Sequence, residues 1–102
     1  MVTTVDPELD ELRREFLAEA QQKVREIESA LAGGKDAAAL ERLAYLAHQL
    51  KGSGGSYGYE RISTEAAALE KAVEEEAPHD GDLRQYVTNL RAEIDERASE
   101  LG

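Results

Sequence analysis

A histidine and a lysine carry the clearest chemical signal in this sequence of 102 residues. His48 and Lys51 stand three residues apart, which on a helix brings two side chains to one face, about 5–6 Å apart at Cβ. A neutral imidazole nitrogen is a nucleophile, and imidazole titrates close to physiological pH. It can attack a phosphoryl group and hold it covalently, while a nearby ammonium offsets part of the added charge. The pair therefore predicts nucleophilic chemistry at His48.

Apolar residues at steps of three and four predict the helices that position these side chains. The expected helices cover residues 6–32, 59–76 and 80–100, and another begins near Asp36. The apolar stripe of the first helix consists of Leu9, Leu12, Phe16, Ala20, Val24, Ile27 and Leu31. No segment alternates with a period of two, as a half-buried strand does. The prediction is an all-α fold, an antiparallel up-down-up-down four-helix bundle.

The helix that begins near Asp36 contains His48, and the sequence leaves its end open. On composition, residues 52–58 (Gly-Ser-Gly-Gly-Ser-Tyr-Gly) favour a loop. If they are helical, each glycine costs about 1 kcal/mol relative to alanine. Gly52 then leaves a flat surface that another molecule can approach closely. On a helical wheel, His48 falls off the apolar stripe, so its ring is expected to be exposed.

Charge and composition exclude several classes of function. The chain has 12 basic and 22 acidic residues, a net charge of −10, so its surface repels nucleic acid and anionic lipid. No apolar run is long enough to span a bilayer. The absence of cysteine excludes a thiolate zinc site and a cysteine nucleophile. No signal peptide is evident, so we expect one soluble, cytoplasmic domain over residues 1–102.

Enzyme and metal motifs that use the same residue types do not fit. A G-x-G-x-x-G pattern that starts at Gly52 needs glycine where Tyr57 stands, and no strand precedes it. His48 has no second histidine or cysteine at helical spacing to share a metal, and Glu41 is two turns away. The serines have no paired base, and His79, between a proline and an aspartate, is expected to be an exposed loop residue. We expect no cofactor and no metal in this chain.

The eleven residues from His48 to Gly58 read His-Gln-Leu-Lys-Gly-Ser-Gly-Gly-Ser-Tyr-Gly. They closely resemble the signature H-x-L-K-G-S-x-x-x-x-G of histidine phosphotransfer (HPt) domains. The resemblance extends to the length of the chain and to the place of the histidine on the second of four helices. It implies that the second helix covers residues 36–57, with Gly58 just past its end and Tyr57 in the core. It also implies a relay of phosphoryl groups between receiver aspartates, often from a hybrid sensor kinase.

The same resemblance assigns roles to individual residues. His48 looks like the phosphorylated residue, on Nε2, Lys51 like the cation that neutralises the phosphoryl charge, and Gly52 like the small residue that admits the partner. Glu70 stands where some family members have a glutamine that hydrogen-bonds the histidine. A carboxylate there would accept a hydrogen bond from Nδ1–H and make Nε2 a better nucleophile; the alternative is a solvent-facing glutamate.

A carrier of this kind leaves most of the catalysis to its partners, a response-regulator receiver domain and a hybrid or sensor histidine kinase. The resemblance implies that Mg²⁺ lies on the receiver, so the chain itself is not an enzyme. Tyr45, Gln49 and Gly55 are expected at the docking surface, and Phe16 is expected in the core. With no surplus apolar stripe, a monomer is expected. The alternative is a helical adaptor that binds a receiver or kinase without carrying phosphate.

Overall fold

Four helices make up most of the computed structural model, which describes residues 7–33, 36–75 and 80–101. They are α1 (Pro7–Ala32), α2 (Ala37–Ser56), α3 (Glu60–Glu74) and α4 (Asp80–Leu101). The predicted boundaries agree to within two residues where they can be compared. Residue 6, residue 76 and His79 lie outside the described residues. No strand occurs within the described ranges, so the all-α prediction is confirmed.

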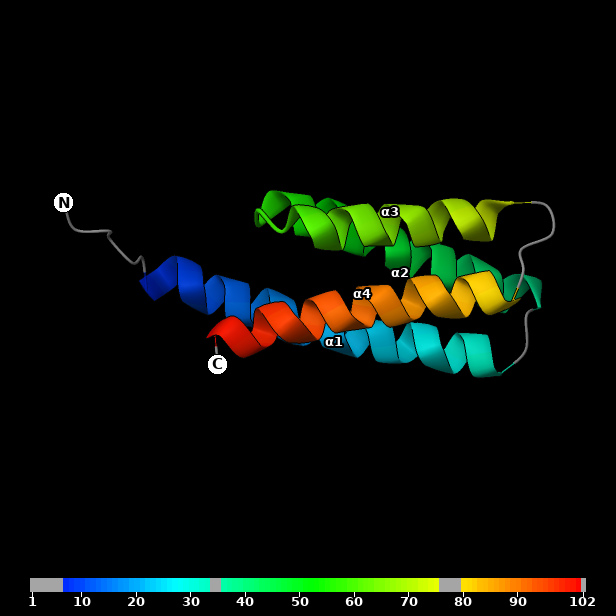
Figure 1. Ribbon diagram of the computed structural model, residues 1–102, viewed down its shortest axis with the longest axis horizontal. Helices are drawn as coiled ribbons and strands as arrows, with labels where there is room; N and C mark the ends of the chain where they lie inside the picture. The colour runs from blue at the N-terminus through cyan, green and yellow to red at the C-terminus, as the bar shows by residue number, and fades with distance from the viewer. Residues whose placement is uncertain (1–6, 34–35, 76–79, 102) are drawn as a thin grey trace.

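The helices form a closed ring in which each packs against two neighbours. α1 contacts α2 and α4, and α3 contacts α2 and α4. Figure 1 shows the four helices lying nearly parallel to one long axis, with successive helices running in opposite directions. This is the predicted up-down-up-down bundle, which requires only short connections.

One apolar cluster fills the centre of the bundle, as the helical periodicities predict. Each helix contributes to it: Phe16, Leu17, Ala20, Val24 and Ile27 from α1; Leu43, Leu46, Ala47 and Leu50 from α2; Ile62, Ala66, Leu69, Ala72 and Val73 from α3; and Leu83, Val87, Leu90 and Ile94 from α4. The prediction that Phe16 is a core residue is confirmed, since its side chain is 5% exposed.

The predicted stripe of α1 is wrong at its first two positions. Leu9 and Leu12 are 36% and 47% exposed. Figure 1 shows the reason, because the first turns of α1 extend beyond the ends of α2 and α3. A sequence pattern gives the face of a helix but not the length over which neighbours cover it. These two leucines continue the stripe where no helix from the other side of the bundle reaches it.

The C-terminal part of α2 corrects the loop suggested by composition. The helix continues through Ser56 and closes with a Schellman motif, in which Gly58 has φ +84°. The backbone N–H of Tyr59 donates to the carbonyl of Gly54 at 2.8 Å, and that of Gly58 donates to Gly55 at 3.1 Å. Glycine suits the left-handed residue because it has no Cβ. Tertiary packing and this cap outweigh the low helix propensity of the glycines.

Close packing on α3 explains why one of these glycines is required. A Cβ on Gly54 would stand 3.1 Å from the backbone nitrogen of Ser63 and 3.2 Å from Cγ2 of Ile62. The hydroxyl of Ser63 also donates to the carbonyl oxygen of Lys51 at 2.8 Å. The end of α2 is therefore fixed against the beginning of α3.

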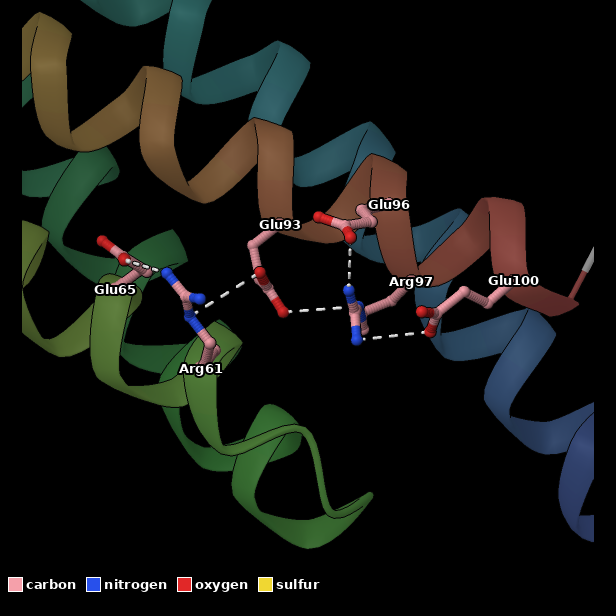
Figure 2. A network of polar contacts seen from close by, with 6 residues as sticks. All are labelled: Arg61, Glu65, Glu93, Glu96, Arg97 and Glu100. Atoms are coloured by element: carbon pink, nitrogen blue, oxygen red, sulfur yellow. Dashed lines mark ion pairs between the residues drawn. The ribbon is translucent and has the colours of Figure 1, made fainter.

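An ionic network joins α3 to α4 (Figure 2). Glu93 of α4, only 8% exposed, lies 3.8 Å from Arg61 of α3 and 3.4 Å from Arg97. Glu65, Glu96 and Glu100 extend the network outward. A nearly buried carboxylate is stable when it is paired with cations. The network thus helps to hold α3, which carries Glu70, in place beside α4.

Candidate functional site

His48 projects from the middle of α2 with its side chain 63% exposed, as the helical wheel predicts. One ring nitrogen is engaged, since Nδ1 lies 2.8 Å from Oε2 of Glu70 on α3. A carboxylate can only accept a hydrogen bond, so in the neutral ring Nδ1 carries the hydrogen and donates it. Nε2 then keeps its lone pair. The contact selects the tautomer in which Nε2 is the nucleophilic nitrogen.

Glu70 holds two side chains of α2 at once. Its Oε2 contacts His48, and its Oε1 lies 3.1 Å from the ammonium nitrogen of Lys51. The Glu70 side chain is 16% exposed. Burial by itself would raise the pKa of Glu70, but the hydrogen bonds from Lys51 and His48 outweigh it and hold this pKa below its usual value. Glu70 is therefore ionised at neutral pH and does not face solvent freely.

The helix geometry explains how these three groups meet. His48 and Lys51 are three residues apart in α2, so both side chains leave the same face of the helix. The hydrogen bond from the Ser63 hydroxyl to the Lys51 carbonyl, with the close packing at Gly54, holds α3 near enough to α2 for Glu70 to reach both side chains. Without a phosphoryl group on His48, the Lys51 ammonium is thus already paired with the Glu70 carboxylate.

A shallow hollow of about 490 Å³ adjoins His48 on the side of α1 and the end of α2. It is lined by Lys23, His48, Gln49, Gly52, Ser53, Ser56 and Tyr57. A Cβ on Gly52 would meet no atom within 4 Å, so any side chain at this position would extend into open space. Gly52 therefore keeps the surface beside His48 low.

Of the other residues predicted at the docking surface, Gln49 lines the hollow, whereas Tyr45 and Gly55 do not. The Nε2 group of Gln49 donates to the hydroxyl of Tyr45 at 2.8 Å, and the tyrosine is 52% exposed one turn before His48. Gly55 is exposed but does not line the hollow; a Cβ added to it would lie 3.7 Å from the Ser63 hydroxyl of α3. Tyr57 is half-buried and stacks on Phe16, with ring centroids 4.9 Å apart.

Sequence reasoning missed three residues of the hollow: Lys23, Ser53 and Ser56. A signal for Lys23 was present, because it lies three residues after Ala20 and four before Ile27, both fully buried. That spacing places a lysine at the edge of the buried face of α1. Composition favoured a loop for the two serines, whereas the family resemblance implied the helix on which the structure places them.

Replacing Glu70 by glutamine is expected to lower the free energy of unfolding by about 1 kcal/mol at pH 7. A carboxyl whose pKa is lower in the folded state stabilises the fold above its unfolded pKa. This contribution is lost as the pH falls through the lowered folded pKa. Urea unfolding of wild type and Glu70→Gln at pH 7 and at about pH 3 checks this. A stability difference of the same size at both pH values would contradict it.

Comparison with known families identifies the chain. The model of the Hpt domain matches residues 11–100, nearly the whole chain, so the protein belongs to the Hpt domain family. Comparisons with curated proteins and with solved structures gave no match. The resemblance seen in the sequence around His48 is thus confirmed at the level of the family. Membership supports a phosphotransfer role in two-component signalling, as a carrier module that works with receiver domains and kinases.

No helix in the described part of the chain is long and apolar enough to cross a membrane. Among the same residues, no group of three or more histidine, cysteine or acidic side chains is arranged to hold a metal ion. The expectation that the chain uses no cofactor of its own remains a prediction.

Proposed function

We propose that this protein relays phosphoryl groups to and from receiver-domain aspartates through a covalent phosphohistidine at Nε2 of His48. The observation that carries the proposal is the contact of Nδ1 with Glu70 in a ring that is largely exposed. It leaves one defined nitrogen available to a partner. The partners are a receiver domain and a hybrid or sensor kinase, and the cellular compartment is the cytoplasm.

The proposed transfer step neither releases nor takes up a free proton. As Nε2 attacks the phosphorus of the partner's acyl phosphate, the P–N bond forms and the P–O bond breaks, which returns the aspartate as a carboxylate. The ring becomes positively charged because Nδ1 keeps its hydrogen. Glu70, at 2.8 Å, stabilises that charge. The receiver would supply the Mg²⁺ and acidic pocket that position the phosphoryl group.

Gly52, Gln49 and Tyr45 support docking in this proposal. The open space above Gly52 lets a partner surface approach His48 closely. Exposed Tyr45, with its hydroxyl held by Gln49, offers a rigid aromatic contact beside the histidine. The protein acts as a monomeric carrier whose helices hold His48, Lys51 and Glu70 in a fixed orientation, while the receiver supplies most of the catalysis.

The direct test is incorporation of acid-labile, base-stable phosphate from phosphorylated receiver domains. A panel of receivers is first screened for binding and then for phosphoryl transfer to this protein. Labelling is the result expected. Receivers that bind while none transfers phosphate would overturn the proposal and favour the non-phosphorylated adaptor.

Lys51 is expected to stabilise the transferred group. Lys51→Ala should slow transfer or shorten the lifetime of the phosphohistidine by at least about tenfold, the effect of losing one charge-assisted hydrogen bond. Lys51→Arg, which keeps the charge, serves as the control. Transfer rates and phosphohistidine half-lives of the two variants are compared with wild type. If both variants lose transfer activity while wild type keeps it, positive charge alone is not what Lys51 supplies.

A further inference from the structure

The hollow beside His48 differs in chemistry from the rest of this acidic protein. The chain has 22 acidic residues, yet none of the residues that line the hollow is acidic. The lining instead offers hydrogen-bond donors: the Lys23 ammonium, the hydroxyls of Ser53 and Ser56, and the side-chain amide of Gln49. A concave surface of donors without a carboxylate suits an anion.

Lys23, the one lysine that lines the hollow, has no acidic partner among the described residues. Within residues 7–33, 36–75 and 80–101, no ion pair or hydrogen bond engages its ammonium group. Lys51 lies outside the hollow's lining and is held by Glu70 at 3.1 Å. Lys23 is half-buried and lines the hollow. A half-buried lysine packs its alkyl stem against apolar surface and keeps its ammonium in reach of solvent.

We propose that Lys23 of α1 is a second phosphoryl-binding cation, which attracts the phosphoryl donor and stabilises the phosphoryl group on His48. Lys23 is more available to a phosphoryl group than Lys51. The ammonium of Lys51 must be shared with Glu70, whose carboxylate also holds the histidine ring. Lys23 has no such competitor and lines the same hollow as His48. Positive charge thus reaches the phosphoryl group from α1 as well as from α2. The inference rests on phosphorylation of His48.

Phosphoramidate is the probe that tests this role, because it is a small phosphoryl donor and needs no docking surface. Its P–N bond breaks, ammonia leaves, and the new P–N bond forms at Nε2. Labelling of the full chain is followed by ³¹P NMR at low ionic strength. Lys23→Gln should be labelled about fivefold more slowly than wild type, the effect of one unit charge at about 4 Å in water. At about 1 M salt the two rates should converge, since screening then acts within about 3 Å.

Two variants separate charge from structure. Lys23→Arg should restore most of the rate. Lys71→Gln removes the same charge from α3, where Lys71 is exposed and lines no part of the hollow, and should be labelled like wild type. Circular dichroism checks that all variants remain helical.

The proposal is overturned if Lys23→Gln and wild type are labelled equally by phosphoramidate. If Lys23→Gln is then slow only with a phosphorylated receiver, Lys23 contacts the partner protein and not the phosphoryl group. Equal slowing in Lys71→Gln would show a general field of the protein and also overturns it. Wild type that is labelled by neither phosphoramidate nor any receiver would instead refute phosphorylation of His48 itself.

Discussion

His48→Gln is expected to abolish acid-labile phosphate incorporation while the protein stays folded and still binds a receiver domain. This is the largest effect expected of any single substitution, because no other described side chain offers an exposed imidazole nitrogen. The side chain is 63% exposed, so its replacement removes little packing. Glutamine can also donate its amide hydrogen to Glu70, which keeps that carboxylate paired.

The measurement is transfer from a phosphorylated receiver, with binding measured in parallel by calorimetry. His79→Gln is the matched control, since it replaces the other histidine of the chain. It should be labelled like wild type. Normal relay by His48→Gln would refute a phosphohistidine at this position, whereas loss of binding in that variant would mean that the substitution acts on docking.

Gly52→Gln should reduce transfer from a receiver by at least about a hundredfold without destabilising the fold. A side chain at this position meets nothing within 4 Å and therefore stands in the path of a docking partner. Because Gly52 is exposed within α2, a better helix former should raise the free energy of unfolding by up to about 1 kcal/mol. Labelling by phosphoramidate should persist, since this donor is small enough to pass.

Gly54→Ala is the matched control, two residues along the same helix. Its Cβ would stand 3.1 Å from the Ser63 backbone nitrogen, so the fold should lose about 1–3 kcal/mol as α2 and α3 separate. The two variants thus predict opposite changes in stability, which thermal and urea unfolding will measure. If Gly52→Gln transfers phosphate at the wild-type rate, Gly52 has no role in access.

The helices and most of the core were predictable because periodicity depends on local geometry. Phe16 and Ile27 fall on the apolar stripe of α1, and both are buried. Leu9 and Leu12 fall on a stripe too, but their exposure depends on where neighbouring helices end, which periodicity does not contain. Composition was wrong for the end of α2, because a contact with Ser63, distant in sequence, overrides the weak helix propensity of glycine.

The candidate site was partly predictable for the same reason. The spacing of His48 and Lys51 is local, so their shared face follows from the sequence. That Glu70 reaches both depends on how α3 is set against α2, and the sequence left a solvent-facing glutamate as the alternative. Lys23 lies on α1, and it comes to line the same hollow as His48 only because α1 packs against α2. The sequence does not contain that packing.

The capped end of α2 has a consequence for how fast a complex can form. A glycine-rich helix end ordinarily frays, and ordering it on contact would cost conformational entropy and slow association. Here the carbonyls of Gly54 and Gly55 accept hydrogen bonds from the backbone that follows the helix. The Ser63 hydroxyl also donates to the carbonyl of Lys51, one turn earlier in α2. The surface below His48 is preorganised before any partner arrives. The rate of complex formation is then set by diffusional encounter and orientation rather than by rearrangement of the carrier.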